Sequence, residues 1–366
     1  MTNPTPEFEN HYPDIVIEHR YRPGDLLHTR KVPLPGLTQA AQGWQIVYAS
    51  TDSYGELIAV SGMVLTPRAD APGVDAVLVY CPAFHGLGGP APSELLAEGR
   101  ETEADRIDAA LEHGFIVAVP DGEGLGAGTG PHTFLAARAA AHTVLDIARA
   151  TARLTEIDAD PAHTVVWGYA DGGRTAVTAA ELHSTYAPEV PLRGVSAGAV
   201  VADPGELAAQ LADSRWAALN LAGLIGLSTA HRHLPLLHVL SDEGRQIAVL
   251  AAKLPLEVLL EQFGQPLGHW CERDDPWADP MWRYVLAREK TGLIIPQIPV
   301  HLYHGTHDAL VPVQHAHALY THYRTAGAAA SWHAYDTDHL SAATDGVAQA
   351  LSLLTDDLGH ATSPEP

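Results

Sequence analysis

The sequence predicts an α/β fold in which helices cover both faces of a mostly parallel sheet. Short runs rich in β-branched residues alternate with longer Ala- and Leu-rich segments of helical periodicity, as is typical of this class. The 366 residues, 46% of them hydrophobic, are enough for one large domain with an insertion or for two domains. Strands are expected at 44–50, 57–65, 76–81, 115–119, 164–169, 193–201, 298–304 and 331–335. Helices are expected at 93–112, 131–155, 172–185, 313–326 and 341–355.

A helical block interrupts this alternation over residues 204–290. It contains many leucines and no strong strand pattern. Inserted between two core strands, it is expected to form a cap over the carboxyl ends of the strands, where α/β sheets bind ligands. A separate domain is the alternative, although only the dipeptides at 204–205 and 291–292 resemble linkers. The expected division is an N-terminal arm (1–30), a core in two parts (31–203 and 291–357), the cap (204–290) and a tail (358–366).

The charge of the chain argues against nucleic acid as a partner. The formal net charge is −23 and the 21 basic residues form no run, so a phosphate backbone would be repelled. No stretch reaches the roughly 20 apolar residues of a membrane span. The N-terminal residues lack a basic start followed by an apolar run, so a cytoplasmic location is expected, although a trimmed secreted form would look the same. The oligomeric state stays open.

The stretch TVVWGYADGG (164–173) has the pattern of a nucleophile elbow in which alanine occupies the position of the nucleophile. An elbow holds its nucleophile on a strained turn between a strand and a helix, so the residues two before and two after must be small. Glycines occupy both positions around Ala170. A nucleophile at Asp171 would instead place Tyr169 in the first crowded position, which a tyrosine cannot occupy. The chain as written should therefore have little or no nucleophilic turnover.

Two explanations of Ala170 remain open. One is a deliberate serine-to-alanine substitution, made so that a substrate or product is held without being consumed. The other is a natural non-catalytic protein that only binds its ligand. A chain that does not catalyse has no chemical reason to keep a base and its orienting acid, so the presence of those groups bears on the choice.

An acid and a histidine follow in the order nucleophile, acid, histidine that α/β-hydrolases use. Asp308 comes directly after a strand in HLYHGTHDALVP, and His339 follows the last strand in YDTDHLSAA. His339 is expected to take the proton from a serine at 170, and Asp308 to orient the imidazole and stabilise its charged form. The catalytic positions are thus Ala170, Asp308 and His339. A turn-forming role is the alternative for Asp308, and Asp203 is a less favoured acid.

Two backbone N–H groups are needed to bind the negative charge that develops on the carbonyl oxygen of a substrate. One is expected from Asp171, at the start of a helix. The other is expected from the loop PAFHGLGGP (82–90), in which Phe84 and His85 are the candidates because Pro82 has no N–H. Phe84, His85 and Asp171 therefore form the expected substrate-binding set.

Two further patterns are not expected to bind a cofactor or metal. The glycine-rich stretch DGEGLGAGTG (121–130) follows a strand, but further glycines and a proline stand where a dinucleotide-binding helix should run. The His-x-His pairs at 231–233 and 315–317 lack companion Cys, Asp or Glu residues at ligand spacing. No metal site is therefore expected.

With these residues placed, the chain resembles the secretory lipase family of α/β-hydrolases, which has fungal lipase A-like and actinobacterial esterase branches. The resemblance covers nearly the whole chain and rests on GDLLHTRKVP, YASTDSYGELIAVSGMVLTP, APS at 91–93, PDGEGLG, GYADGG, HGTHDALVP and TDHLSAA. Members typically carry G-Y-S-Q-G-G at the elbow, so Ala170 and Asp171 both depart from the pattern. The usual H-G-T at the end of the oxyanion strand is replaced here by CPA (81–83).

The resemblance implies an α/β-hydrolase fold with a helical cap insertion. It also implies hydrolysis of small hydrophobic carboxylic esters, with lactones as further possible substrates, through an acyl-enzyme and without a metal or organic cofactor. The large cap implies a deep and mostly apolar pocket. An acyltransferase that uses the same residues is an alternative.

Overall fold

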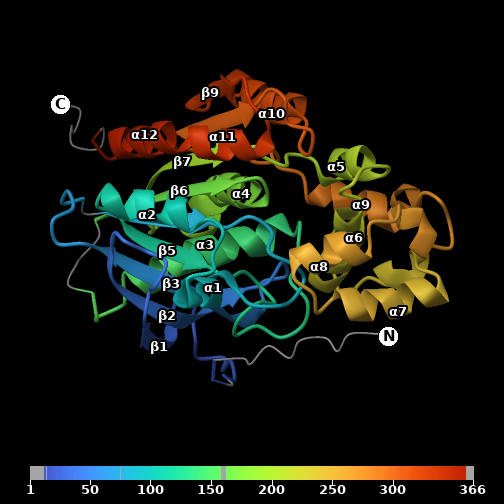
Figure 1. Cartoon of the computed structure of the whole chain (residues 1–366), viewed down its shortest axis with the longest axis horizontal. Helices are drawn as coiled ribbons and strands as arrows, with labels where there is room; N and C mark the ends of the chain where they lie inside the picture. The colour runs from blue at the N-terminus through green and yellow to red at the C-terminus, as the bar shows by residue number, and fades with distance from the viewer. Residues whose placement is uncertain (1–11, 14, 75, 158–161, 360–366) are drawn as a thin grey trace.

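The computed structural model describes residues 12–13, 15–74, 76–157 and 162–359 (Figure 1). Within these residues one sheet of nine strands has the order β1-β2-β3-β5-β4-β6-β7-β8-β9. The strands are β1 (Leu26–Val32), β2 (Ala40–Thr51), β3 (Leu57–Pro67), β4 (Ala76–Cys81), β5 (Ile116–Pro120), β6 (His163–Tyr169), β7 (Leu192–Gly198), β8 (Val300–Gly305) and β9 (Ala330–Tyr335). Pairing is parallel from β5 through β4 to β9 and antiparallel among β1, β2, β3 and β5. The predicted α/β class with a mostly parallel sheet is confirmed.

The strand β1 was missing from the sequence-based expectations. Its first five residues, 26–30, belong to the segment expected as an N-terminal arm, yet they pair with β2 at the edge of the sheet. Their side chains are only partly buried or exposed, so the segment LLHTRKV lacks the apolar run that marks the inner strands. Pairing with a neighbouring strand, rather than burial, makes this segment a strand.

Helices cover both faces of the sheet. Residues of α3, α4 and α10 join the hydrophobic cluster on one face, and residues of α1, α2, α11 and α12 join the cluster on the other. The side chains of β4 alternate between the two clusters, as expected for a strand buried on both faces. The helices are α1 (Pro92–Glu98), α2 (Ala104–Glu112), α3 (Ala137–Thr151), α4 (Asp171–Tyr186), α10 (Val313–Thr325), α11 (His339–Asp345) and α12 (Val347–Gly359).

Two of the expected helices are each divided into two by a glycine. The helix expected at 93–112 ends at Gly99, whose φ of 69° and N–H bonds to the preceding carbonyls stop α1. The helix expected at 341–355 is split at Gly346, which separates α11 from α12. At Gly346 the hydrophobic periodicity continues through the break, so the pattern alone predicts one helix there.

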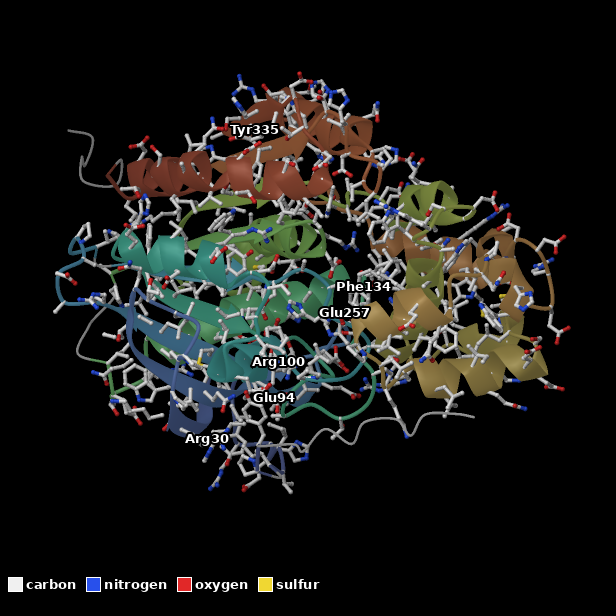
Figure 2. All side chains as sticks on the ribbon, viewed as in Figure 1. Arg30, Glu94, Arg100, Phe134, Glu257 and Tyr335 are labelled. Atoms are coloured by element: carbon white, nitrogen blue, oxygen red, sulfur yellow. The ribbon has the colours of Figure 1, made fainter. Side chains whose placement is uncertain are left out.

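The cap segment consists of helices and short 3-10 turns at one end of the molecule (Figure 1). They are α5 (Pro204–Leu211), α6 (Ala218–Ala230), η1 (Leu236–Val239), α7 (Asp242–Ala251), α8 (Leu256–Gln262), η2 (Leu267–Trp270), η3 (Pro276–Ala278) and α9 (Pro280–Arg288). Their hydrophobic cluster also includes Phe84, Leu87, Phe134 and Val311, from loops that follow core strands. Figure 2 shows Phe134 at this junction. The cap segment therefore packs on the carboxyl-end loops of the sheet.

Backbone hydrogen bonds join the cap segment to the loop after β4. The N–H groups of Leu87 and Gly88 donate to the carbonyl of Leu254 at 3.1 and 3.2 Å, and Leu256 donates to the carbonyl of His85 at 2.8 Å. Between these bonds, Gly86 forms a bridge with residue 255. The loop in which a second oxyanion donor was predicted is thus held from the cap side by three backbone hydrogen bonds.

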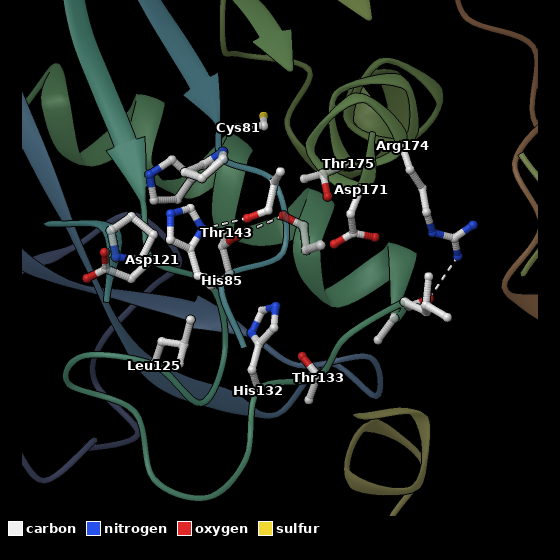
Figure 3. A pocket seen from close by; sticks show the side chains of 18 of the residues that line it. Cys81, His85, Asp121, Leu125, His132, Thr133, Thr143, Asp171, Arg174 and Thr175 are labelled. Carbon is white, nitrogen blue, oxygen red and sulfur yellow. Dashed lines mark hydrogen bonds between the residues drawn. The ribbon is translucent and has the colours of Figure 1, made fainter. Parts of the chain in front are cut away.

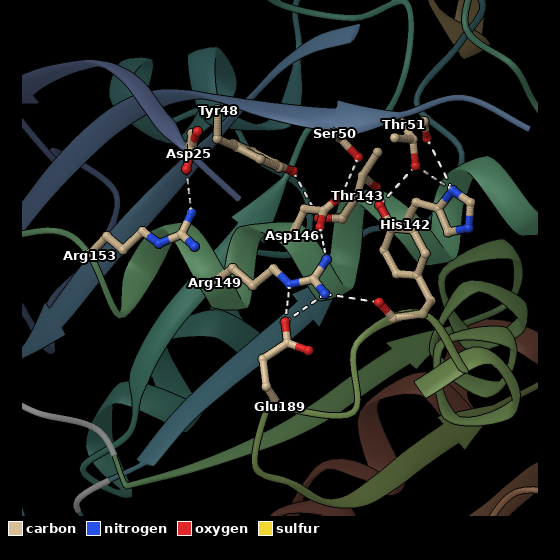
Figure 4. Close-up of polar contacts among 11 residues, drawn as sticks. Asp25, Tyr48, Ser50, Thr51, His142, Thr143, Asp146, Arg149, Arg153 and Glu189 are labelled. Carbon is tan, nitrogen blue, oxygen red and sulfur yellow. Dashed lines mark hydrogen bonds and ion pairs between the residues drawn. The ribbon is translucent and has the colours of Figure 1, made fainter. Parts of the chain in front are cut away.

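A buried polar cluster links β2, α3 and α4 (Figure 4). The carboxylate of Asp146 accepts hydrogen bonds from Ser50 and Tyr186, both at 2.7 Å. Arg149 pairs with Asp146 at 2.6 Å and also with Glu189. Burial raises the pKa of Asp146 to about 6, against the effect of these partners. Because the partners are neighbouring protein groups, we assign the cluster a structural role.

The close approach at Gly86 predicts a stability effect. A Cβ at this position would lie 2.5 Å from the Cα of Pro255 and 2.6 Å from the carbonyl oxygen of Leu254. We expect Gly86→Ala to lower the free energy of unfolding by about 1–3 kcal/mol, measured by urea denaturation. Gly73→Ala is the control, since a Cβ there meets nothing within 4 Å, and it should change stability by less than about 0.5 kcal/mol. Equal midpoints for the two variants would contradict the contact.

Candidate active site

The turn between β6 and α4 has the geometry of an elbow. Ala170 has φ 54° and ψ −115°, a conformation that only glycine adopts without strain. Its N–H donates to the carbonyl of Gly198 at 2.9 Å, which fixes the turn to the end of β7. The chain thus passes from strand to helix through one strained residue.

The glycines two residues before and two residues after Ala170 are required by close backbone contacts, Gly168 with the start of α4 and Gly172 with the end of β4. A Cβ on Gly168 would lie 2.2 Å from the carbonyl oxygen of Gly172. A Cβ on Gly172 would lie 2.0 Å from the carbonyl oxygen of Cys81. Contacts this short do not occur for real side chains, so both positions must be glycine. The spacing that identified the frame in the sequence follows from these contacts.

Asp308 and His339 lie next to each other, as their order in the chain suggested. Asp308 follows β8 and His339 is the first residue of α11. The Nδ1 atom of His339 lies 2.6 Å from Oδ2 of Asp308. The other oxygen, Oδ1, accepts the backbone N–H groups of Leu310 and Val311 at 2.9 and 2.8 Å. The carboxylate therefore makes turn-forming contacts through one oxygen and contacts the imidazole through the other.

The environment of Asp308 keeps its carboxyl group ionised. Its side chain is fully buried, and burial alone would raise the pKa. Hydrogen bonds from His304 and His339, together with the charge of His339, lower the pKa well below its usual range. His304 is itself buried and lies 3.2 Å from the same oxygen. His304 was not among the predicted site residues, although its position four residues before Asp308 at the end of a strand is compatible with such a contact.

The position of His339 is also fixed from the elbow side. The hydroxyl of Tyr169, the residue before Ala170, donates to the carbonyl of His339 at 2.6 Å. The two rings are 5.1 Å apart. The rival acid Asp203 lies elsewhere, where it accepts N–H groups of the first turn of α5 and pairs with Lys290 at 2.5 Å. Asp308 is therefore the carboxylate that contacts His339.

The loop after β4 is held by two acidic residues that the sequence analysis missed. The N–H of Ala83 donates to Glu103 at 3.0 Å, so Ala83 already has an acceptor. His85 donates from Nδ1 to the carbonyl of Ala83 at 2.7 Å and from Nε2 to Glu101 at 3.0 Å. Phe84 is stacked on a neighbouring phenylalanine in the cap cluster. Within the described residues, the backbone N–H groups of Phe84 and His85 have no acceptor.

The side chain of His85 is a buried cation. Burial alone would lower its pKa, but the hydrogen bond and charge of Glu101 raise the pKa to about 9. The same pairing lowers the pKa of Glu101, against the effect of burial. The pair is almost fully buried, with 12% of the His85 side chain and 1% of the Glu101 side chain exposed. The side chain of His85 thus holds the loop whose backbone N–H groups were predicted as oxyanion donors.

A cavity of about 50 Å³ lies beside the elbow (Figure 3). Its lining comes from the core loops and the first turns of α3 and α4, and includes His85, Asp171 and Arg174. Ala170, Asp308, His339 and Phe84 do not line it, and neither does any residue of 204–290. This cavity is therefore not the deep, mostly apolar pocket expected under the cap segment. Apolar residues such as Leu125 and Leu135 make up much of its wall, and polar side chains such as His132 and Thr133 interrupt it.

The carboxyl group of Asp171 faces this cavity (Figure 3). Burial raises its pKa to about 6, and the charge of Arg174 opposes this shift. The backbone N–H of Asp171 lies in the first turn of α4, where N–H groups have no acceptor within the helix. The same residue thus presents a backbone donor at the elbow and a side-chain acceptor to the cavity.

Comparison with known proteins places this fold in a family. The model of the secretory lipase family matches residues 91–363. The chain belongs to the secretory lipase family. Among its relatives are a protein of Mycobacterium tuberculosis named "Probable inactive lipase", 28% identical over 94% of this chain and 80% of its own, and lipase A of Arthroderma benhamiae, 27% identical over 98% and 79%. The closed state of Candida antarctica lipase A superposes with a TM-score of 0.83 at 22% identity, covering 94% of this chain and 84% of that one.

Membership in the secretory lipase family has two consequences. The fold is that of an α/β-hydrolase, and the scaffold is that of a family of lipases and esterases. The expected cytoplasmic location is wrong, because the family is described as secretory and a relative from Malassezia furfur is named a secreted triacylglycerol lipase. A signal peptide is removed on export, so the first residues of a sequence are a poor guide to location. None of the described helices combines the length and apolar character of a membrane span.

The buried pair of His85 and Glu101 predicts a pH-dependent stability. The folded pKa of His85, about 9, is above its ordinary value of 6.5, so the stabilisation is complete below the ordinary value and is lost as the pH rises through 9. We expect this pair to account for a fall on the order of 3 kcal/mol in the free energy of unfolding between about pH 6 and pH 10. The check is urea denaturation at both pH values.

Glu101→Gln should flatten this pH dependence, because burial without the carboxylate lowers the pKa of His85. Glu98→Gln is the matched control, since Glu98 is an exposed acid that pairs with Arg100 on the same segment. A slope in Glu101→Gln equal to that of the unmodified chain would contradict the assignment.

Proposed function

We propose that the chain has the framework of a serine hydrolase for carboxylic esters, lactones included, and that alanine at 170 disables it. The observation that supports this most is the hydrogen bond between Asp308 and His339, kept next to a strained elbow. A buried, ionised carboxylate that orients an imidazole is the arrangement that activates a hydroxyl nucleophile. The family membership of the chain supports the same reaction class.

With serine at position 170, each group would have a defined step. His339 would accept the hydroxyl proton at Nε2 while Oγ attacks the carbonyl carbon of the ester. The alcohol would leave with that proton, and a water molecule activated by His339 would then hydrolyse the acyl-enzyme. Asp308 would hold the tautomer of the imidazole with Nδ1–H and stabilise its charged form. The methyl group of Ala170 has no lone pair with which to attack the carbonyl carbon. The reaction therefore stops after the ligand binds.

The negative charge of the tetrahedral intermediate would be bound by backbone N–H groups. Asp171 supplies one donor from the first turn of α4. The second comes from Phe84 or His85, since the N–H of Ala83 is already bonded to Glu103. An acyltransferase would use the same groups with an alcohol in place of water.

A natural ligand-binding protein on this scaffold is the second candidate. The observation that favours it is the relative named "Probable inactive lipase", which aligns with 94% of this chain. Such a protein would hold an ester or its product in the site without turnover. An alanine codon at position 170 in the native gene would support this reading, and a serine codon would support a deliberate substitution.

Restoring the nucleophile tests the first candidate. We expect Ala170→Ser to hydrolyse p-nitrophenyl esters or hydrophobic lactones with a kcat at least roughly 10³-fold above that of the alanine chain, because only the attacking atom is missing. The measurement is release of p-nitrophenol, or of acid in a pH-stat for lactones. Failure of the serine form on a broad panel of both substrate types would refute the hydrolase proposal.

The triad assignment is tested in the Ala170→Ser background. Asp308→Asn should lower kcat by roughly 10⁴-fold, because the amide favours the wrong tautomer of the imidazole. Asp336→Asn is the control, since Asp336 is a nearby exposed acid that pairs with His307. Equal effects of the two substitutions would remove Asp308 from the mechanism.

The binding reading makes a separate prediction for the alanine chain. We expect it to bind an intact ester with a Kd within about tenfold of the KM of the serine form, because one hydroxyl changes ground-state binding by only about 1 kcal/mol. Isothermal titration calorimetry with esters that the serine form hydrolyses gives the comparison. Absence of binding for every such ester would eliminate the binding protein.

A further inference from the structure

The cavity beside the elbow is rich in hydrogen-bond acceptors. The Asp171 carboxylate faces it, and within the described residues that carboxylate has no hydrogen bond or ion pair. Figure 3 shows this carboxylate in the middle of the lining side chains, with Arg174 on one side and His85 and His132 on the other. Asp171 is half-buried, and a carboxylate that is partly withdrawn from water without a partner gains from a donor, so a group that occupies the cavity and donates to it would be stabilised.

A second acceptor comes from His132. Burial lowers the pKa of this histidine to about 4, so its ring is neutral at ordinary pH. Its Nδ1 lies 2.8 Å from the carbonyl oxygen of Glu123, so Nδ1 carries the proton and donates it there. The remaining nitrogen, Nε2, is then an acceptor. His85 offers no acceptor, because both of its nitrogens donate to other groups.

Arg174, which lines the cavity, also has a buried donor atom that lacks a partner. Arg174 is only 1% exposed and donates to the carbonyls of Val201, Leu135 and Glu289, yet its Nε–H has no acceptor. Arg174 lines the same cavity as Asp171, one helical turn further along α4. A hydroxyl group can donate to a carboxylate and accept from an N–H at once, whereas an ammonium group can only donate.

The size of the cavity limits what fits. Its 50 Å³ holds about three to five water-sized groups, since each needs roughly 10–15 Å³. An alkyl chain of lipid length exceeds this space, and an apolar chain would leave the acceptors unpaired. A short chain that ends in or carries a hydroxyl satisfies both limits.

We propose that this cavity recognises the hydroxyl of a short hydroxyacyl group, with Asp171 as the acceptor, and that the ligands of this site are esters of short hydroxy acids. The inference rests on the proposed function, because the cavity adjoins the backbone N–H of Asp171 that would bind the ester carbonyl. It assigns Asp171 two separable roles: the backbone acts on the reacting carbonyl, and the side chain selects the acyl group.

The test compares four ethyl esters in the Ala170→Ser background by pH-stat. Ethyl 3-hydroxybutyrate carries the hydroxyl, ethyl butyrate lacks it, ethyl 3-aminobutyrate carries an ammonium, and ethyl octanoate is long and apolar. We expect kcat/KM for the hydroxy ester to exceed that for the butyrate by about tenfold or more, the size of a hydrogen bond to a charged group. A preference for octanoate or for the ammonium ester would overturn the proposal.

Asp171→Asn isolates the side chain, because it keeps the backbone N–H and the shape of the residue. It should reduce the preference for the hydroxy ester over the butyrate at least severalfold, while Glu123→Gln should leave that ratio unchanged. Burial raises the pKa of Glu123 to about 7, so it is also a buried acid, but it does not line the cavity. Should Asp171→Asn fail to fold by circular dichroism, Asp171→Ser provides the same comparison.

Failure of this inference and failure of the proposed function give different results. A serine form that hydrolyses butyrate and hydroxybutyrate equally, with no effect of Asp171→Asn, refutes the hydroxyl assignment alone. A serine form that hydrolyses none of the esters refutes the hydrolase proposal. In that case calorimetry on the alanine chain decides the recognition question: tighter binding of the hydroxy ester supports it, and equal binding of the two esters refutes it.

Discussion

At Ala170 the chain passes from β6 to α4 through a single residue with a positive φ, and the geometry of the site follows from this crossing. The turn requires glycine at 168, where a side chain would overlap the backbone of α4, and at 172, where it would overlap the backbone at the end of β4. It also presents the first turn of α4, with its unpaired N–H groups, beside the loop after β4. The residue at 170 contributes only its side chain, which lies at the turn between β6 and α4. The backbone is therefore ready for a nucleophile whether or not one is present.

The loop after β4 is the second half of this arrangement, and it is held from two directions. On the core side, Glu101 binds the cationic His85 and Glu103 binds the N–H of Ala83. On the cap side, backbone hydrogen bonds join residues 85–88 to Leu254 and Leu256. A displacement of the cap segment would therefore pull on the loop that carries the predicted oxyanion donors. A few backbone hydrogen bonds therefore connect the cap segment directly to the loop that carries the predicted donors.

The sequence predicted the parts of the molecule that depend on local pattern. The inner strands were found because they are continuously apolar, and the elbow because its glycines follow from sterics. Asp308 and His339 were found from chain order, and the fold brings them into contact. The edge strand β1 and the breaks at Gly99 and Gly346 escaped prediction, because pairing and backbone conformation decide them rather than apolar periodicity.

The character of the cavity could not be predicted for a related reason. Its walls come from loops and helix starts that are distant in sequence, and periodicity shows that such residues are buried without showing what they face. Glu101 illustrates this limit: nothing in the letters ETEAD indicates that the first glutamate binds His85, sixteen residues earlier. The cap segment suggested an apolar pocket because its leucines are numerous, but those leucines pack among themselves and against Phe84 and Leu87.

The strained backbone at Ala170 and the pairing of Asp308 differ in what they indicate about catalysis. A positive φ at a non-glycine residue costs about 1–3 kcal/mol, but the crossing imposes it whatever the side chain, so its persistence says nothing about catalysis. A buried carboxylate is different, because it is costly unless it is bonded, and its removal would relieve the cost. Here Asp308 is fully buried and ionised against His339 and His304, while one edge of the imidazole stays partly exposed. Retention of that pair beside an elbow without a nucleophile is what the proposed hydrolase framework predicts.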